Sequence, residues 1–405
     1  MTKDTYVIIF IIGWALSDRL IEHFFNFNPD IFLEVTIFII ALAFFVLKIH
    51  YVRINFSELL LLSFVFYLIF VTCLVFNANA IVPIIRFYIF PLILLFVFKY
   101  CFINRFRYIK AINYVNLFVL SISLVFVYFR DSSPLFQPLS HVEHSFLDGH
   151  QNMNSGLFDS AWELGVYCVF SFLFSLYSHF IVKQSYLTVF NFFLSISSSL
   201  ISGSRTSFLI ILILLFLFVF VFYRNKSLMI ITALAIIGGS IFLLFPDRIV
   251  FFFTELHLQN RFLELFTFFS LDSNSFTHFG LGAGAYGNVL LPLAERELIE
   301  NSIVSEFYNY SYVKDSIFTL VFANFGFFGL LFFVFLSVYF VSILSRDLLY
   351  LILFKVDPFF FFKFSGAFVY LAYLLKGHSA FRSSALLVFC LFIFNLVKVE
   401  GSNEK

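Results

Sequence analysis

The chain has very little charge for its length. Only 12% of its 405 residues are Asp, Glu, Lys or Arg, whereas 61% are hydrophobic. So few charged side chains cannot cover the surface of a water-soluble protein of this size. The composition excludes a soluble globular domain and predicts an all-α polytopic membrane protein, in which residues 1–405 form one integral membrane domain in contact with membrane lipids. No nucleic acid is expected as a partner.

Cysteine and signal-peptide features are scarce as well. The four cysteines stand in or at the ends of apolar segments and have no CxxC spacing, which excludes a disulfide framework and a cysteine-ligated metal. Only Lys3 precedes the first apolar stretch, and no small-residue cleavage site follows it. The first segment is therefore expected to remain as an uncleaved span.

Long apolar segments are abundant. A helix needs about 20 mostly apolar residues to cross the hydrocarbon of a bilayer, and about 12 segments are predicted to do so: 5–24, 31–47, 57–76, 82–98, 111–129, 161–182, 186–202, 206–223, 228–245, 318–344, 359–375 and 380–397. Asp18, Arg19 and Glu22 make the first the weakest. The 69 phenylalanines are spread through these segments, so we interpret them as lipid-facing and packing side chains.

Lysine and arginine are distributed unevenly between the connections of these segments. If the amino terminus is cytoplasmic, most of them fall on the cytoplasmic side, as the positive-inside rule requires. Both termini are then cytoplasmic, and two long polar segments, 130–160 and 246–317, face the opposite side. Apolar residues recur from Phe251 to Phe266 in the second segment, which predicts a helix lying at the membrane interface.

Arg205 lies in the turn Gly203-Ser204-Arg205 between the segments 186–202 and 206–223. An arginine is expensive to bury in lipid, so this one is expected at a membrane surface or facing a polar cavity. It is a candidate binding residue. The alternative is an anchor that reaches lipid headgroups, but an anchor does not need the serines and the threonine that surround it.

Two sequence patterns in the segments 130–160 and 246–317 resemble ligand-binding motifs but lack the surrounding secondary structure that such motifs require. Gly282–Gly287 has the spacing of a dinucleotide-binding loop, but that loop requires a preceding strand and a following helix in a βαβ unit. Three histidines, His141, His144 and His150, are sufficient in number to ligate a metal ion. Gly149 and nearby prolines, however, predict an irregular loop there. We therefore expect neither a cofactor nor a metal.

Several short motifs follow one another between residues 110 and 397. They are Gly156-Leu157-Phe158-Asp159, Ser202-Gly203-Ser204-Arg205-Thr206-Ser207, Asn260-Arg261-Phe262, Phe279-Gly280-Leu281-Gly282-Ala283-Gly284, Asp315-Ser316 and Gly326-Phe327-Phe328-Gly329 opening a span. Their order and spacing resemble the bacterial O-antigen polymerase and O-antigen ligase superfamily. The resemblance implies a GT-C-like glycosyltransferase architecture in the bacterial inner membrane, with a periplasmic active face.

The resemblance also implies the substrates. Such enzymes use undecaprenyl-diphosphate-linked oligosaccharides, and a chain-length regulator protein is an expected partner. Negative charge grows on the diphosphate as the glycosidic bond breaks, and neither outer segment has an Asp-x-Asp metal motif, so a cationic side chain is expected to stabilise that charge. Arg205 and Arg261 match the family's two arginine positions, and arginine binds phosphate oxygens bidentately. The reserve candidates are Arg130, Arg248, Arg296 and Arg382.

Arg261 has an alternative interpretation. Glu264 follows it at a spacing that places both side chains on one helix face, where they can form an ion pair without any ligand. Sequence alone leaves both possibilities open.

The acceptor hydroxyl needs a general base or an orienting acceptor. Ligase-type members of the family have a histidine just before the span that corresponds to 318–344, whereas this chain has Lys314-Asp315. That difference favours a polymerase with Asp315 as base, although an aspartate there can also cap the helix. Further candidates for the catalytic step are Glu163, Asp159 and His150, and His278 and His378 are candidates for sugar binding.

The sequence therefore predicts a metal-independent, inverting polymerase of surface polysaccharide, such as O-antigen or capsule. One alternative is the related ligase, which transfers finished glycan to lipid A core. The other is a flippase for the same lipid-linked sugars. A flippase is expected to have internal repeats, charges at mid-membrane and short loops on both sides. This sequence has no internal repeat, most of its ionisable residues stand at the ends of predicted spans, and the connection 246–317 is long.

Overall fold

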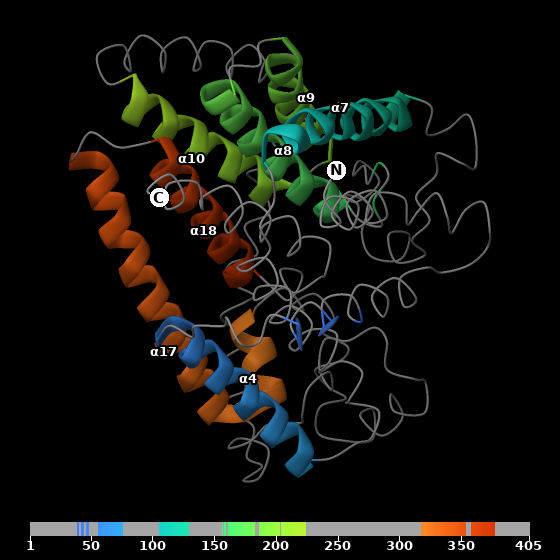
Figure 1. Cartoon of the computed structure of the whole chain (residues 1–405). Helices are drawn as coiled ribbons and strands as arrows, with labels where there is room; N and C mark the ends of the chain where they lie inside the picture. Colours follow the sequence, from blue (N-terminus) through green and yellow to red (C-terminus); the bar gives the residue numbers. More distant parts are fainter. Residues whose placement is uncertain are drawn as a thin grey trace.

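The computed structural model describes residues 39, 42–43, 46–47, 56–75, 105–128, 156, 158, 161–182, 186–202, 204–223, 317–353 and 358–376. The regular structure in these residues is entirely α-helical (Figure 1). The helices are α4 (Phe56–Val75), α7 (Arg105–Tyr128), α8 (Ala161–Val182), α9 (Tyr186–Ser202), α10 (Arg205–Phe222), α17 (Ile317–Leu353) and α18 (Pro358–Lys376).

Seven of the predicted apolar segments coincide with these helices. α8 and α9 have the predicted bounds, α7 begins earlier, at Arg105, and α17 continues beyond residue 344 to Leu353. The prediction of an all-helical protein is confirmed for the described residues. The predicted spans 5–24, 82–98, 228–245 and 380–397, and most of 31–47, lie outside them.

One stretch of the described residues is long and apolar enough to cross a membrane. It is Phe325–Leu353, with 29 residues. Shorter apolar helical stretches accompany it, namely Leu59–Val71, Ile112–Val125, Tyr186–Leu200, Thr206–Phe222 and Phe360–Tyr373.

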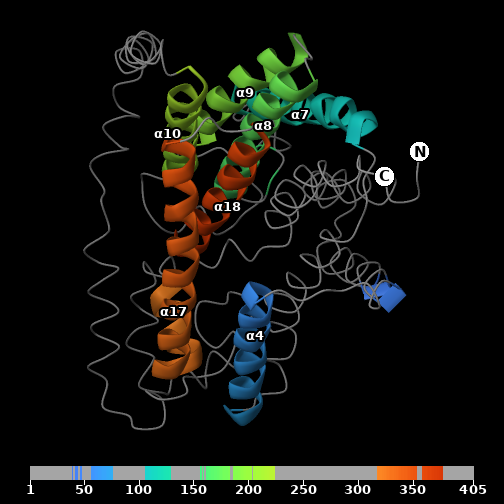
Figure 2. The same cartoon turned by 60° about the vertical axis from the view of Figure 1, so that its left-hand side comes forward.

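α8 is the central helix of a bundle. α7, α9, α10 and α18 all pack against it (Figure 1), and every residue from Leu164 to Ser178 is buried. α8 is therefore enclosed by its neighbours along most of its length. α4 lies outside this bundle and packs along the first half of α17 (Figures 1 and 2).

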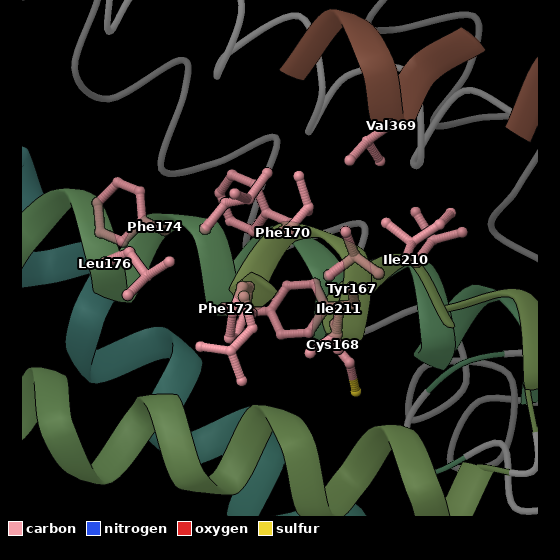
Figure 3. Packing of buried hydrophobic residues seen from close by; sticks show 14 of the residues in the cluster. Tyr167, Cys168, Phe170, Phe172, Phe174, Leu176, Ile210, Ile211 and Val369 are labelled. Carbon is pink, nitrogen blue, oxygen red and sulfur yellow. The ribbon is translucent and has the colours of Figure 1, made fainter. Parts of the chain in front are cut away.

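Aromatic rings fill much of the bundle core. Phe170, Phe172 and Phe174 of α8 belong to one core cluster with Ile210 and Ile211 of α10 and Val369 of α18 (Figure 3). Tyr177 meets Phe362 of α18 edge to face at a centroid separation of 5.4 Å, a favourable geometry for two aromatic quadrupoles. The packing role predicted for the phenylalanines is therefore confirmed in the described core.

α9 has its polar side chains inside and its large apolar side chains outside. The buried face is largely polar, with Thr188, Asn191, Ser195, Ser198, Ser199 and Ser202 recurring at helical spacing. The opposite face exposes Val189, Phe190 and Phe193. A helix of a soluble protein has the reverse arrangement, with its apolar stripe facing the core.

Hydrogen bonds hold the buried polar groups of α7, α8 and α9 together. The side-chain amide of Asn191 donates to the backbone oxygen of Asn113 at 2.7 Å. Tyr167 of α8 donates its hydroxyl to Oδ1 of Asn116 at 2.5 Å. These bonds fix the register of α7 against its two neighbours, because a shift of either helix would leave a polar group buried without its partner.

α17 is broken at Gly326. Its backbone there has φ 66° and ψ −167°, a conformation that is essentially restricted to glycine. The break brings the Cβ of Phe325 so close to Gly329 that no side chain fits at that position. Tyr67 of α4 donates its hydroxyl to the backbone oxygen of Phe325 at 3.2 Å, next to the break. Gly326-Phe327-Phe328-Gly329 was expected to open the span, but it forms a kink inside the helix.

Candidate functional site

The ends of four helices meet at one polar cluster. These are the beginning of α8, the end of α9, the beginning of α10 and the last turns of α18. Gly165 of α8 lies directly against Ser204 and Ser207, and Tyr373 of α18 is hydrogen-bonded to Ser207. Trp162 meets the Tyr373 ring edge to face at 5.3 Å. We call Trp162, Gly165, Ser204, Ser207 and Tyr373 the turn cluster.

Serine hydroxyls organise the turn between α9 and α10. Ser202 donates its hydroxyl to the backbone oxygen of Ser199 at 2.8 Å and accepts the backbone N–H of Ser204 at 3.2 Å. The Oγ atoms of Ser204 and Ser207 are 2.7 Å apart. All of these serines are buried, and the hydroxyls of Ser202, Ser204 and Ser207 stabilise the turn through hydrogen bonds to the backbone or to each other in place of water.

Arg205 is the first residue of α10, and the structure describes its backbone. Ser204 is the N-cap, but its side chain makes no capping hydrogen bond to the helix, because its hydroxyl pairs with Ser207. The first N–H groups of a helix have no partner within the helix and carry a partial positive charge. Arg205 therefore follows an N-cap whose side chain makes no hydrogen bond to the first N–H groups of α10, an arrangement that suits an anionic ligand.

Gly165 allows α8 to approach the first turn of α10 closely. A Cβ atom at this position would lie 2.5 Å from the Cβ of Ser204 and 2.6 Å from its Oγ. A serine hydroxyl can rotate away, but the Cβ of Ser204 is fixed by the backbone. The position therefore requires glycine for its lack of a side chain.

We expect Gly165→Ala to push α10 away from α8 and to break the hydrogen bond between Ser207 and Tyr373. Overpacking of this kind destabilises by about 1 to 3 kcal/mol. The measurement is the apparent thermal unfolding midpoint of the purified full chain in detergent. Ser365→Ala in α18 is the control, because its buried hydroxyl has no hydrogen-bond partner in the structure. Equal midpoints for Gly165→Ala and wild type would contradict the close approach.

Glu163 lies half-buried in the first turn of α8, next to Trp162 of the turn cluster. A carboxylate in the first turn also stabilises the helix through its dipole. The structure thus places Glu163, a predicted catalytic candidate, at the same end of the bundle as Arg205, and it gives this glutamate a structural role as well.

Gly156 and Phe158 of the motif at residues 156–159 pack against α7 and α8. Gly156 has φ 58°, and a Cβ atom there would lie 2.8 Å from the Cβ of Ser123 in α7. Phe158 is buried, with its ring centroid 5.2 Å from that of Tyr167. Glycine and phenylalanine in this motif therefore have packing roles, and Asp159 lies outside the described residues.

The remaining predicted site residues also lie outside the described residues. They are Asp315, Arg261, His150, Arg130, Arg248, Arg296, Arg382, His278 and His378. Asp315 precedes the first residue of α17, Ile317. Sequence reasoning missed three members of the turn cluster, Trp162, Gly165 and Tyr373. Each stands in an apolar or aromatic segment where nothing distinguishes it from ordinary packing residues.

We compared the chain with protein-family models, with characterised proteins and with solved structures, and none of them matched.

Proposed function

We propose that the chain is a membrane-embedded polymerase of surface polysaccharide. It transfers a glycan from one undecaprenyl diphosphate to the repeat unit carried by another, at the periplasmic face of the bacterial inner membrane. The single observation that carries this proposal is the meeting of four helix ends at the turn cluster, with Arg205 as the first residue of α10.

The inverted polarity of α9 supports the membrane part of the proposal. Its buried face has amides and hydroxyls, whereas its exposed face has Val189, Phe190 and Phe193. Water would favour the opposite arrangement, but lipid favours apolar side chains outside and small or polar ones between helices. α7 follows the same pattern, with Asn113 and Asn116 buried and Phe118 exposed.

Helix directions support a common outer face for the candidate residues. α8 and α10 begin at the turn cluster, whereas α9 and α18 end there. The predicted topology requires the same alternation, because the segments 161–182 and 206–223 run inward and the segments 186–202 and 359–375 run outward. Arg205 and Glu163 then lie at the periplasmic end of the bundle.

The proposed chemistry uses these groups as follows. The donor's glycosidic bond to the diphosphate breaks while an acceptor hydroxyl forms the new bond, with inversion at the anomeric carbon. The guanidinium of Arg205 and the first N–H groups of α10 stabilise the charge on the leaving diphosphate. A carboxylate, Asp315 or Glu163, accepts the proton of the acceptor hydroxyl.

The test is depletion of the protein in a strain that makes long-chain surface polysaccharide, followed by electrophoresis of its glycans. We expect surface glycans with a single repeat unit. Polymer that stays on undecaprenyl diphosphate would indicate a ligase, and single repeat units retained on the cytoplasmic side would indicate a flippase. Full-length polymer on the cell surface after depletion would refute all three functions.

A further inference from the structure

The turn that precedes Arg205 is tied to a helix far away in the sequence. The Oη atom of Tyr373 lies 2.7 Å from Oγ of Ser207, which lies 2.7 Å from Oγ of Ser204. The backbone N–H of Ser204 in turn donates to the hydroxyl of Ser202. A continuous chain of hydrogen bonds thus runs from α18 through the first turn of α10 to the end of α9.

The chain of hydroxyls ends next to the proposed diphosphate site. Either oxygen of each hydroxyl pair can be the donor, and in both directions the two distances of 2.7 Å hold Ser207 between Tyr373 and Ser204. Ser204 is the residue immediately before Arg205, so the orientation of Tyr373 is linked to the turn that carries this arginine.

The Tyr373 ring is itself held in place. The side chain is buried, with an exposed fraction of 1%. The Trp162 ring meets it at an interplanar angle of 81°. Since Gly165 lets α8 approach Ser204 and Ser207 closely, α8 fixes both ends of the bond between Tyr373 and Ser207. A phenol with so little freedom can hold the first turn of α10 in one orientation.

We propose that Tyr373 is a positioning residue for diphosphate binding, acting through Ser207 and Ser204 on the orientation of the Arg205 turn. This inference rests on the proposed function and extends it to a residue on α18. Bidentate recognition of a phosphate group by arginine depends on a defined orientation of the guanidinium. Removal of the phenol oxygen therefore weakens binding of the diphosphate while the aromatic packing around Trp162 remains.

The test compares two probes, undecaprenyl diphosphate and undecaprenol, binding to the purified full chain in detergent. Tyr373→Phe is expected to weaken diphosphate binding roughly tenfold, the effect of one hydrogen bond. Undecaprenol has no phosphate group for Arg205 to bind, so its affinity stays at the wild-type value and the ratio of the two affinities falls. A general loss of structure would lower both affinities together.

Matched variants make the result specific. Tyr167→Phe also removes a buried tyrosine hydroxyl bonded to a side chain, in this case Asn116, but that bond has no link to the Arg205 turn, so the affinity ratio stays at the wild-type value. Ser207→Ala breaks the same chain one step closer to Arg205 and lowers the ratio as Tyr373→Phe does. It replaces that variant in the test if Tyr373→Phe does not fold.

Two outcomes separate this inference from the function on which it rests. If Tyr373→Phe and Ser207→Ala keep the wild-type ratio while Arg205→Ala loses diphosphate binding, the positioning role is overturned and the proposed function stands. If Arg205→Ala also binds undecaprenyl diphosphate as the wild type does, the proposed site is overturned and the positioning role with it.

Discussion

Arg205→Ala is expected to abolish long-chain polysaccharide and to slow glycan transfer about 100- to 1000-fold, the usual effect of removing one group that stabilises developing negative charge. Alanine leaves the backbone of α10 helical but removes the cation beside the N–H groups at its start. The measurement is the length distribution of surface glycans, together with the initial rate of polymer formation in membranes. Arg205→Lys keeps the positive charge but lacks the planar guanidinium group, so a smaller loss of the transfer rate is expected.

Arg346→Ala is the matched control for this prediction. Arg346 lies on α17, its side chain is 77% exposed, and it pairs with the adjacent Asp347 at 3.3 Å. An exposed pair of this kind contributes about 0 to 1 kcal/mol, so the glycan pattern stays at wild type. A wild-type glycan ladder from Arg205→Ala would remove Arg205 from the mechanism and leave only its role as a membrane-surface anchor.

Gly326→Ala is expected to have the largest effect on the folded state. A side chain at φ 66° and ψ −167° introduces strain of about 1 to 3 kcal/mol, and straightening α17 to relieve it moves the oxygen of Phe325 away from the Tyr67 hydroxyl. Gly329→Ala produces a similar loss by a different route, through the clash with Phe325. The apparent unfolding midpoint of the purified chain in detergent measures both.

Ser337→Ala on the same helix provides the comparison. Its hydroxyl is buried and has no hydrogen-bond partner in the structure, so its removal is nearly neutral or slightly stabilising. A midpoint for Gly326→Ala that matches the midpoint for Ser337→Ala would show that the break in α17 is not required for stability.

Helix positions could be predicted from the sequence because they depend on the length of uninterrupted apolar runs. Polar residues bound α8 and α9 clearly, and both helices have the predicted limits. The extension of α17 to Leu353 was missed because Arg346 and Asp347 resemble the end of a span, yet they pair on the helix surface. The break at Gly326 was missed because glycine is also common at the ends of helices, and no local pattern distinguishes the two uses.

The candidate site was predictable only in part. Arg205 is conspicuous because a charge between two apolar segments needs an explanation, and the structure places it at the start of α10. Tyr373 had no such signal. Its role depends on a hydrogen bond to a residue 166 positions away, and only the packing of α18 against α8 and α10 brings the two together. A lone tyrosine in an aromatic helix is otherwise indistinguishable from core packing.

The separation between Ser207 and Tyr373 also sets an order of events during synthesis. At the usual rate of translation, roughly ten seconds or more pass between these two residues. By the end of that interval α8, α9 and α10 have been synthesised, but the Ser207 hydroxyl has not yet met Tyr373. The hydrogen bond between Ser207 and Tyr373 therefore forms late, when the last described helix joins the bundle. Premature termination before Pro358 leaves a chain that has Arg205 but neither α18 nor that hydrogen bond.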